Sequence, residues 1–348
     1  MPPDSEPLLY YSKRVKDGEL AGLTHWILFS AEEGIYATNL VNGQKHAQLV
    51  VANVTDVTAM AVDSNQGYLF VAIQDDEDSS HIDRYHFKIA NDVRPPLMSV
   101  NTTTKLEVYL GKVISSLAVD GDQSILYVAD TLAERIDQVQ YDARTLDLAN
   151  TVSGVTSQVY EGLANFDKLT ALAVDKTGEI YWTVSEGGST DGSIVRARAD
   201  DPKTTSIRKV SMALDGAHDL AYETDFVLFA GKDEGDGAGA RSAVYYKSIP
   251  RNGQQSLSVK RITSDLDDCV GLGAFDSYIY VADAVQGILA VESFGDDIFS
   301  TPRAIPLQLD GGKAVPKPTT MVTFTLGALA NATVSLVALA AVACTILF

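Results

Sequence analysis

A short pattern that recurs along most of the chain constrains its fold more than any other feature. In the clearest copy, Leu172-Ala173-Val174-Asp175 is followed through Gly178 by Ile180-Tyr181-Trp182-Thr183. Each copy is a small apolar run that ends in a polar turn, followed by a run rich in aromatic and β-branched residues. Aligned on the middle of the second run, the copies fall at Phe29 (a partial copy), Phe70, Tyr127, Tyr181, Leu228 and Tyr280. Such self-similarity is typical of solenoids, propellers and other repeat architectures.

The runs within each unit predict strands. They are short, rich in Val, Ile, Tyr and Phe, and bounded by Asp, Gly, Asn and Ser, and no stretch before residue 320 shows sustained helical periodicity. The fourth unit divides into runs at 169–174, 179–184, 193–199 and 206–211. Four strands in each of six units predict an all-β domain, a six-bladed β-propeller over residues 26–309. A β-helix or a pair of β-sandwiches is the alternative architecture.

The second runs resemble the YWTD repeats of low-density-lipoprotein-receptor-type propellers, and the related NHL-type repeats. The resemblance rests on Val174-Asp175 with Tyr181-Trp182-Thr183, and on Val119-Asp120 with Tyr127-Val128-Ala129-Asp130. The Asp that closes the motif is present as Asp130 and Asp283. The resemblance implies a disc that binds a protein or glycan partner through one face, with Tyr181 and Trp182 in the core.

Charge and composition exclude some functions. The formal net charge is -19, from 46 acidic and 27 basic side chains, and Lys and Arg are not clustered. Nucleic acid is therefore excluded as a partner, because its phosphates must be met by basic clusters. The acidity suits a solvated surface, a basic protein partner or calcium. The two cysteines, Cys269 and Cys344, do not form a disulfide framework, and no phosphate-binding or dinucleotide-binding loop is present, so no organic cofactor is expected.

The C-terminal segment predicts membrane attachment. Residues 321–348 contain no charged side chain and are long enough to cross a bilayer as a helix. The sequence therefore predicts a linker at 310–320 followed by a hydrophobic membrane helix or a glycosylphosphatidylinositol (GPI) attachment signal at 321–348. The GPI alternative uses Asp310-Gly311-Gly312 as its small residues. The other alternative is a tail anchor that leaves the propeller in the cytosol.

The preferred location is the extracellular or lumenal side, where the sequons at Asn53 and Asn101, both expected in loops, would be glycosylated. Residues 1–25 contain no secretory apolar region, which favours the cytosolic alternative. The first unit also lacks a clear inner strand before Trp26. Either a strand from elsewhere in the chain, the segment 1–25 included, completes that blade, or residue 1 is not the natural start.

Two acidic runs, at 75–78 and 233–237, each follow a second strand, so their loops are expected on the same face of the disc. Carboxylates are the ligands that calcium prefers. Neither run has the spacing of a known calcium loop, and a solvated loop is the alternative. The candidate calcium ligands are Asp75, Asp76, Asp78, Asp233 and Asp236.

Polar residues at the starts of the inner strands are expected to surround the central channel. They are Asp56, Lys112, Asp167, His218, Asp219 and Asp268, and all except Lys112 are candidate catalytic residues. In a calcium-dependent lactonase or esterase of propeller type, such a ring holds the metal and acts on water. The sequence therefore favours a membrane-tethered binding module, with a hydrolase of this type or a structural subunit of a membrane assembly as alternatives.

Overall fold

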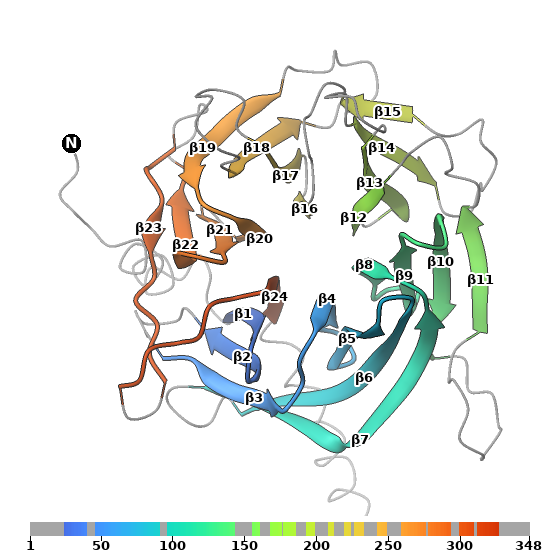
Figure 1. Ribbon diagram of the computed structural model, residues 1–348, viewed down its shortest axis with the longest axis horizontal. Helices are drawn as coiled ribbons and strands as arrows, with labels where there is room; N and C mark the ends of the chain where they lie inside the picture. Colours follow the sequence, from blue (N-terminus) through green and yellow to red (C-terminus); the bar gives the residue numbers. More distant parts are fainter. Residues whose placement is uncertain are drawn as a thin grey trace, which may run out of the picture.

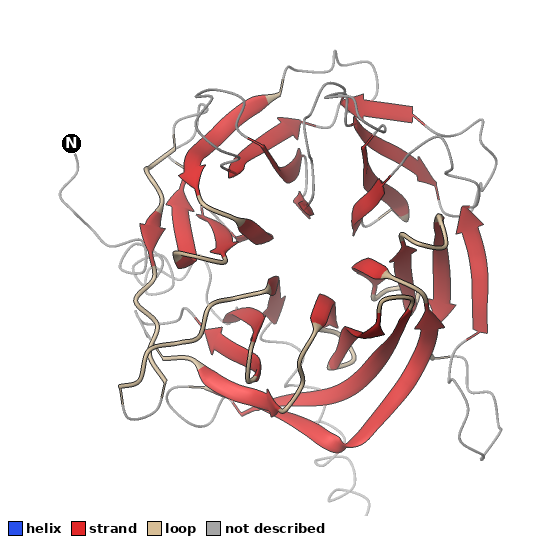
Figure 2. Ribbon diagram, in the orientation of Figure 1, coloured by secondary structure: helices blue, strands red, loops and turns tan. Residues whose placement is uncertain are grey.

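The computed structural model is a ring of six four-stranded sheets around a central axis (Figures 1 and 2). The strands of each sheet are antiparallel and follow one another from the axis to the rim. The predicted all-β, six-bladed propeller is therefore confirmed. The structure describes residues 24–39, 46–90, 96–142, 155–160, 168–175, 177–185, 193–198, 208–211, 219–223, 226–232, 242–248, 259–275, 278–293, 299–309 and 312–326.

The blades are numbered here from the sheet that contains β1, and their strands are given from the axis outward. Blade 1 contains β24 (Thr320–Leu326), β1 (Thr24–Ala31), β2 (Gly34–Asn39) and β3 (Gln48–Ala52). Blade 2 contains β4 (Val57–Asp63), β5 (Tyr68–Asp76), β6 (Ser79–Ala90) and β7 (Leu97–Gly111). Blade 3 contains β8 (Ile114–Asp120), β9 (Ile125–Asp130), β10 (Arg135–Gln140) and β11 (Val155–Tyr160).

The remaining blades follow the same order. Blade 4 contains β12 (Lys168–Val174), β13 (Glu179–Ser185), β14 (Ser193–Arg198) and β15 (Arg208–Ser211). Blade 5 contains β16 (Asp219–Glu223), β17 (Phe226–Lys232), β18 (Ser242–Ser248) and β19 (Lys260–Leu266). Blade 6 contains β20 (Cys269–Phe275), β21 (Tyr278–Asp283), β22 (Gly287–Glu292) and β23 (Arg303–Ala304).

The antiparallel order assigns every loop to one of two faces of the disc. We call the face where the inner strands begin the upper face, and the face where they end the lower face. Loops that lead into an inner strand share the upper face with the loops between second and third strands. The turns between first and second strands lie on the lower face. The acidic run at 75–78, at the end of β5 and in the turn before β6, is therefore on the upper face, and the run at 233–237, predicted on the same face, lies outside the described residues.

The middle residues of the six repeats form the core between blades. Each lies on the second strand of its blade and is at most 2% exposed. Trp182 belongs to the same core cluster as Tyr127 of the preceding blade, and Tyr280 to the same cluster as Phe29 of the following one. Large flat side chains fill the wedge between neighbouring sheets, while small residues of the inner strands leave room near the axis. The prediction that Tyr181 and Trp182 belong to the core is confirmed.

Buried aspartates hold both ends of the repeat unit. Asp130 and Asp283 end the second strands of blades 3 and 6 and are fully buried. The Asp130 carboxylate accepts hydrogen bonds from the N–H groups of Lys112, Val113 and Ala133. At the lower face, Asp120 accepts hydrogen bonds from the N–H groups of the turn that follows β8. These carboxylates satisfy loop donors that the sheets leave unpaired, so their role is structural.

The inner strand of blade 1 comes from the other end of the described chain. β24 pairs with β1 along its whole length, with Trp26 opposite Phe324 and Phe29 opposite Met321. One of the two explanations for the missing strand, a strand from elsewhere in the chain, is thereby confirmed. The prediction that a membrane segment begins at Met321 is wrong for 321–326, because an uncharged Val, Phe and Thr run suits a buried strand as well as a helix in lipid.

Two consequences follow for membrane attachment. GPI attachment at residues 310–312 would remove β24 from the ring, so that site is incompatible with the closed propeller. The described residues contain no helix long and apolar enough to cross a membrane. Residues 1–23 and 327–348, which carry the rest of the predictions for both termini, lie outside the described residues.

The contact between blades 6 and 1 requires glycine. A Cβ on Gly271 of β20 would lie 2.5 Å from the Cβ of Met321, and one on Gly273 would collide with the side chain of Thr323. The residues at the same register positions of blade 3 are Ser116 and Ala118. Because glycine has no Cβ, β24 approaches its neighbouring blade more closely than these side chains would allow.

Candidate functional site

A cavity runs along the axis of the ring and is the main candidate site. Its volume is about 560 Å³, and the inner strands of all six blades line it. A cavity of this size falls in the range that holds small ligands or the side chains of a partner. Of its described lining residues, Asp219 and Asp268 carry charge at neutral pH, and none is Lys or Arg. The cavity therefore has a negative character.

The carboxylates gather on the side of blades 5 and 6, near the upper face. Asp219 begins β16 and is partly exposed, and Asp268, which is exposed, directly precedes β20. Burial raises the pKa of the Cys269 thiol well above its usual value, and the charges of Asp219, Asp283 and Asp268 raise it further. The thiol is therefore protonated at neutral pH and is no nucleophile. Asp219, Asp268 and Cys269 all line this part of the cavity.

Hydroxyl groups occupy the side of blades 2 to 4. The Ser115 Oγ donates a hydrogen bond to the carbonyl oxygen of Leu169 at 3.0 Å, and the Ser116 Oγ accepts one from the Leu172 N–H at 2.9 Å. These bonds join the inner strands of blades 3 and 4. The Thr58 Oγ1 is buried without a hydrogen-bond partner among the described residues. Thr58 therefore offers the cavity a hydroxyl that is not used in the fold.

His25 lies at the lower end of the cavity and is almost completely buried. Its ring stacks on Phe275 of blade 6, with centroids 4.2 Å apart. Its Nδ1 is hydrogen-bonded to the Thr325 Oγ1 at 3.2 Å, and its Nε2 has no partner among the described residues. Burial lowers the pKa of His25 to about 3, so the ring is neutral at physiological pH.

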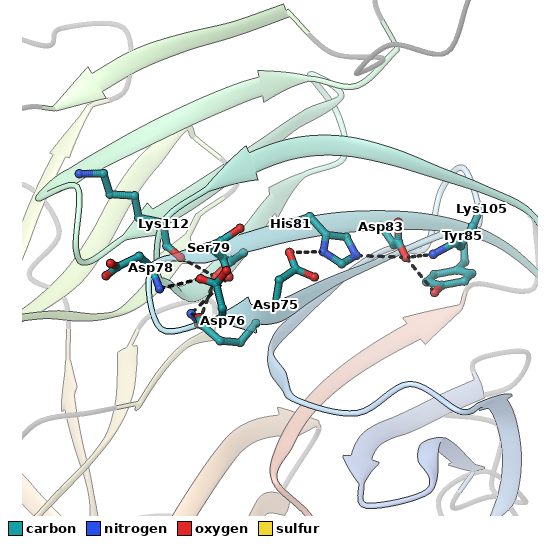
Figure 3. A network of polar contacts seen from close by, with 11 residues as sticks. Asp75, Asp76, Asp78, Ser79, His81, Asp83, Tyr85, Lys105 and Lys112 are labelled. Atoms are coloured by element: carbon teal, nitrogen blue, oxygen red, sulfur yellow. Dashed lines mark hydrogen bonds and ion pairs between the residues drawn. The ribbon is translucent and has the colours of Figure 1, made fainter.

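The acidic loop of blade 2 forms a separate polar network (Figure 3). Asp75 pairs with the Nδ1 of His81 at 2.8 Å, whereas the Asp76 carboxylate accepts a hydrogen bond from the Asp78 N–H at 2.9 Å. On the other side of His81, the buried Asp83 forms an ion pair of 2.8 Å with Lys105. Asp75 and Asp76 thus point toward different partners rather than toward one central point.

Calcium binding stays a prediction. Among the described residues, no three acidic, His or Cys side chains converge in the manner of metal ligands. Two of the candidate ligands, Asp233 and Asp236, lie outside the described residues.

The structure brings together two of the six residues predicted around the channel, Asp219 and Asp268, whereas Lys112 does not line the cavity. Asp56 does not line the cavity; it is exposed, adopts a positive φ of 55° and accepts a hydrogen bond from the Thr55 Oγ1. Asp167 and His218 lie outside the described residues. The sequence reasoning missed Thr58 and His25 as lining residues.

The two sequon asparagines are both exposed. Asn53 lies in the loop between β3 and β4, as predicted. Asn101 was expected in a loop and lies instead within β7, at the rim of blade 2, because the outer hairpin of that blade is longer than the repeat predicts.

Comparison with known proteins finds similarity in fold but not in sequence family. No known sequence family matches it, and no curated protein has a significantly similar sequence. Among solved structures, a chain of a nidogen/laminin complex is 11% identical with a TM-score of 0.58, over 86% of this chain and 98% of that one. A putative 6-phosphogluconolactonase from Bacteroides fragilis is 10% identical with a TM-score of 0.53, over 86% and 98%.

TolB from Acinetobacter baumannii is also similar, at 10% identity and a TM-score of 0.55, over 82% of this chain and 65% of that one. At such identities these likenesses show the fold alone. The fold defines a six-bladed β-propeller, here with an acidic axial cavity, and proteins that share this fold include binding modules and lactonase-like enzymes.

Proposed function

We propose that this protein is a membrane-tethered binding module whose upper face recognises a protein or glycan partner. The observation that carries the proposal is the set of acidic groups at the channel and beside it on that face. Asp219 and Asp268 stand at the channel, and the exposed residues 76–78 lie above blade 2. The lower face also carries exposed acidic groups, Asp122 and Asp142, but neither lines the channel. A rigid disc with acidic groups around a central cavity offers a broad docking surface.

The charge favours a basic protein as the partner. The chain carries a formal net charge of -19, and attraction between opposite surface charges accelerates association and selects the orientation of docking. The similar chain of the nidogen/laminin complex belongs to a protein–protein assembly, which supports a protein partner in general. The capping role of Asp130 and Asp283 supports assignment of the repeats to the YWTD type.

The tether in this proposal is the segment that follows β24. Residues 327–348 include no charged side chain and, as a helix rising 1.5 Å per residue, would span about 33 Å, close to the thickness of a hydrocarbon core. β24 ends at the lower face, so the chain leaves the disc there. The upper face would then point away from the membrane. On the extracellular or lumenal side, the exposed Asn53 and Asn101 would be accessible for glycosylation.

Proximity labelling in native membranes tests the proposal. The full chain would be fused to a labelling enzyme and compared with the variant Asp76→Lys/Asp78→Lys on the upper face and the matched variant Asp122→Lys on the lower face. We expect the upper-face variant to lose one or more labelled proteins that the lower-face variant retains. Equal labelling by both variants would contradict recognition through the upper face.

Intact-mass analysis of the protein from its own membranes tests the tether and its side. Membrane association that depends on residues 327–348, together with glycans on Asn53 or Asn101, is the expected result. A full-length chain without glycans would place the disc in the cytosol. Loss of 327–348 without loss of membrane association would contradict the tether.

A hydrolase is the second candidate, because Asp219 and Asp268 line one cavity. A propeller described as a putative 6-phosphogluconolactonase shares the fold. The described lining offers no Lys or Arg for a phosphate group, so the substrate of such an enzyme would be an unphosphorylated lactone or ester. A substrate panel with and without a calcium chelator separates the two functions. Hydrolysis that is lost on chelation and in Asp268→Asn would favour the enzyme.

A further inference from the structure

The upper mouth of the channel combines negative charge with a hydrogen-bonding group that the fold does not use. Asp219 and Asp268 lie on one side, and the Thr58 Oγ1, which has no partner among the described residues, lies on another. We propose that the partner inserts a cationic side chain, Lys or Arg, into this mouth between the two carboxylates. This inference rests on the proposed binding function and specifies the chemistry of the partner at the channel.

The carboxylates favour a cation over other occupants. Both line the cavity at the starts of the neighbouring inner strands β16 and β20, so their negative potentials add at this point of the mouth. The described lining has no basic side chain to neutralise them, and His25 is neutral because burial lowers its pKa to about 3. In a cavity partly shielded from water, an approaching cation is attracted more strongly than at the open surface. An anionic side chain would be repelled by the same groups.

The size and the lining suit a long basic side chain. The cavity of about 560 Å³ accepts such a side chain without displacement of the inner strands. Val270, near the start of β20 and beside the carboxylates, lines the cavity as well, and it can contact the methylene groups of the side chain while the charge is held at the carboxylates. A guanidinium or ammonium group has several donors, enough for two carboxylates and the Thr58 hydroxyl together.

The surface around the mouth suits a protein segment. Three of the large hydrophobic side chains exposed on the described surface lie on the upper face: Leu110 at the end of β7, Leu132 between β9 and β10, and Val285 between β21 and β22. They are 57%, 45% and 53% exposed. Apolar contacts around a central polar anchor are typical of protein interfaces. Two exposed lysines also lie on this face: Lys112 precedes β8 of blade 3, away from the carboxylate side, and Lys317 precedes β24 of blade 1, which neighbours blade 6; neither lines the cavity.

The experiment compares two synthetic peptides that differ in charge alone. One is an acetylated and amidated pentapeptide of glycine with Arg in the centre, and the other has citrulline, the neutral isostere, in its place. Binding to the full chain would be followed by NMR up to about 10 mM, since a single anchor is expected to bind in the millimolar range. We expect the Arg peptide to bind at least about fivefold more tightly than the citrulline peptide, a preference typical of a charge-assisted pair.

Variants test which carboxylates cause the preference for the Arg peptide over the citrulline peptide. In Asp219→Asn/Asp268→Asn the ratio of the two affinities should fall to about one, as expected when the charged acceptors are neutralised. The matched variant Asp122→Asn/Asp142→Asn, at exposed positions on the lower face, should keep the parent ratio. The single variant Asp268→Asn, at an exposed position, serves if the double variant does not fold.

Three results would overturn the inference: equal affinities of the two peptides for the parent protein, no binding of the Arg peptide, or a ratio of affinities unchanged by the channel variants.

Failure of the proposed function can be distinguished from failure of this inference. If partner labelling still depends on Asp76 and Asp78 while the peptide ratio is one, the face binds a partner and the channel takes no cation. If labelling is independent of the upper face but the ratio depends on the channel, the site binds cations outside the proposed function.

Discussion

Two contacts between neighbouring blades, 2–3 and 6–1, hold the ring together by different means. Between blades 2 and 3, the Tyr109 hydroxyl donates to Asp137 at 2.6 Å, and the Tyr141 hydroxyl donates to Asp63 at 2.7 Å. Between blades 6 and 1, Gly271 and Gly273 admit β24, and His25 stacks on Phe275. The first contact joins blades adjacent in sequence, whereas the second joins the two ends of the described chain. The contact that closes the ring, between blades 6 and 1, thus depends on close shape complementarity. The contact between the consecutive blades 2 and 3 uses buried hydrogen bonds instead.

Removal of β24 should have the largest effect. A chain that ends at residue 312 lacks the inner strand of blade 1 and exposes the edge of β1, so we expect no cooperative unfolding transition in thermal circular dichroism. A chain that ends at residue 328 keeps β24 and should unfold cooperatively. A cooperative transition in the shorter chain would show that closure by β24 is dispensable.

Acid should weaken the 6–1 contact through His25. Its pKa is about 3 in the folded protein and about 6.5 when unfolded, so between these values the unfolded state holds more protons. The free energy of unfolding should therefore decrease as the pH falls from about 6.5 to about 3, by on the order of 4 kcal/mol in total. His25→Gln should remove this part of the pH dependence, measured by urea unfolding across the range. The same slope in parent and variant would exclude His25 as its source.

A methyl group added at the contact between blades 6 and 1 should lower the free energy of unfolding. Gly273→Ala places a Cβ against Thr323, and we expect a loss of about 1–3 kcal/mol in the free energy of unfolding, as for overpacked cores. The matched change in blade 3 is Ala118→Gly, at the same register position, with an expected loss of about 0.5–1 kcal/mol. If Gly273→Ala is neutral or stabilising, β24 can move outward, and close approach is not required for closure.

The polar contact should show the smallest effect. Tyr141→Phe removes one donor to Asp63, whose carboxylate keeps its bonds to the N–H groups of Asn65 and Gln66. We expect a loss of about 1–2 kcal/mol, measured by chemical unfolding. Tyr36→Phe, whose hydroxyl bonds to Glu33 within blade 1, is the control and should cost less than about 1 kcal/mol. Equal losses in the free energy of unfolding for the two variants would show that the hydrogen bond between blades contributes no more to stability than the one within blade 1.

The fold was predictable because each repeat carries its own signal. The middle residues of the second strands, from Phe29 to Tyr280, were located by alignment of the sequence with itself, and all six are buried. β24 was not predictable as a strand, since its residues begin a longer uncharged stretch and no copy of the repeat surrounds it. Its pairing partner β1 lies nearly 300 residues earlier, beyond the reach of local pattern.

The candidate site was predictable in part for the same reason. The positions of Asp219 and Asp268 follow from the start of an inner strand, which the repeat defines. The role of His25 could not be inferred, because its neighbours Phe275 and Thr325 are 250 or more residues away in sequence. The excess of hydroxyl residues at inner-strand starts, such as Thr58, Ser115 and Thr170, is a signal in the sequence that would have indicated a polar channel lining.

The pairing of β1 with β24 also bears on how copies of the protein associate. β1 is the first described strand to be synthesised and β24 is the last, so the inner edge of β1 stays open while the other five blades form. An open edge pairs with any strand of suitable sequence, and the β24 of a second copy has the same hydrogen-bonding groups and the same fit against β20. When many chains refold together, exchange of this one strand would produce dimers in which every blade is complete.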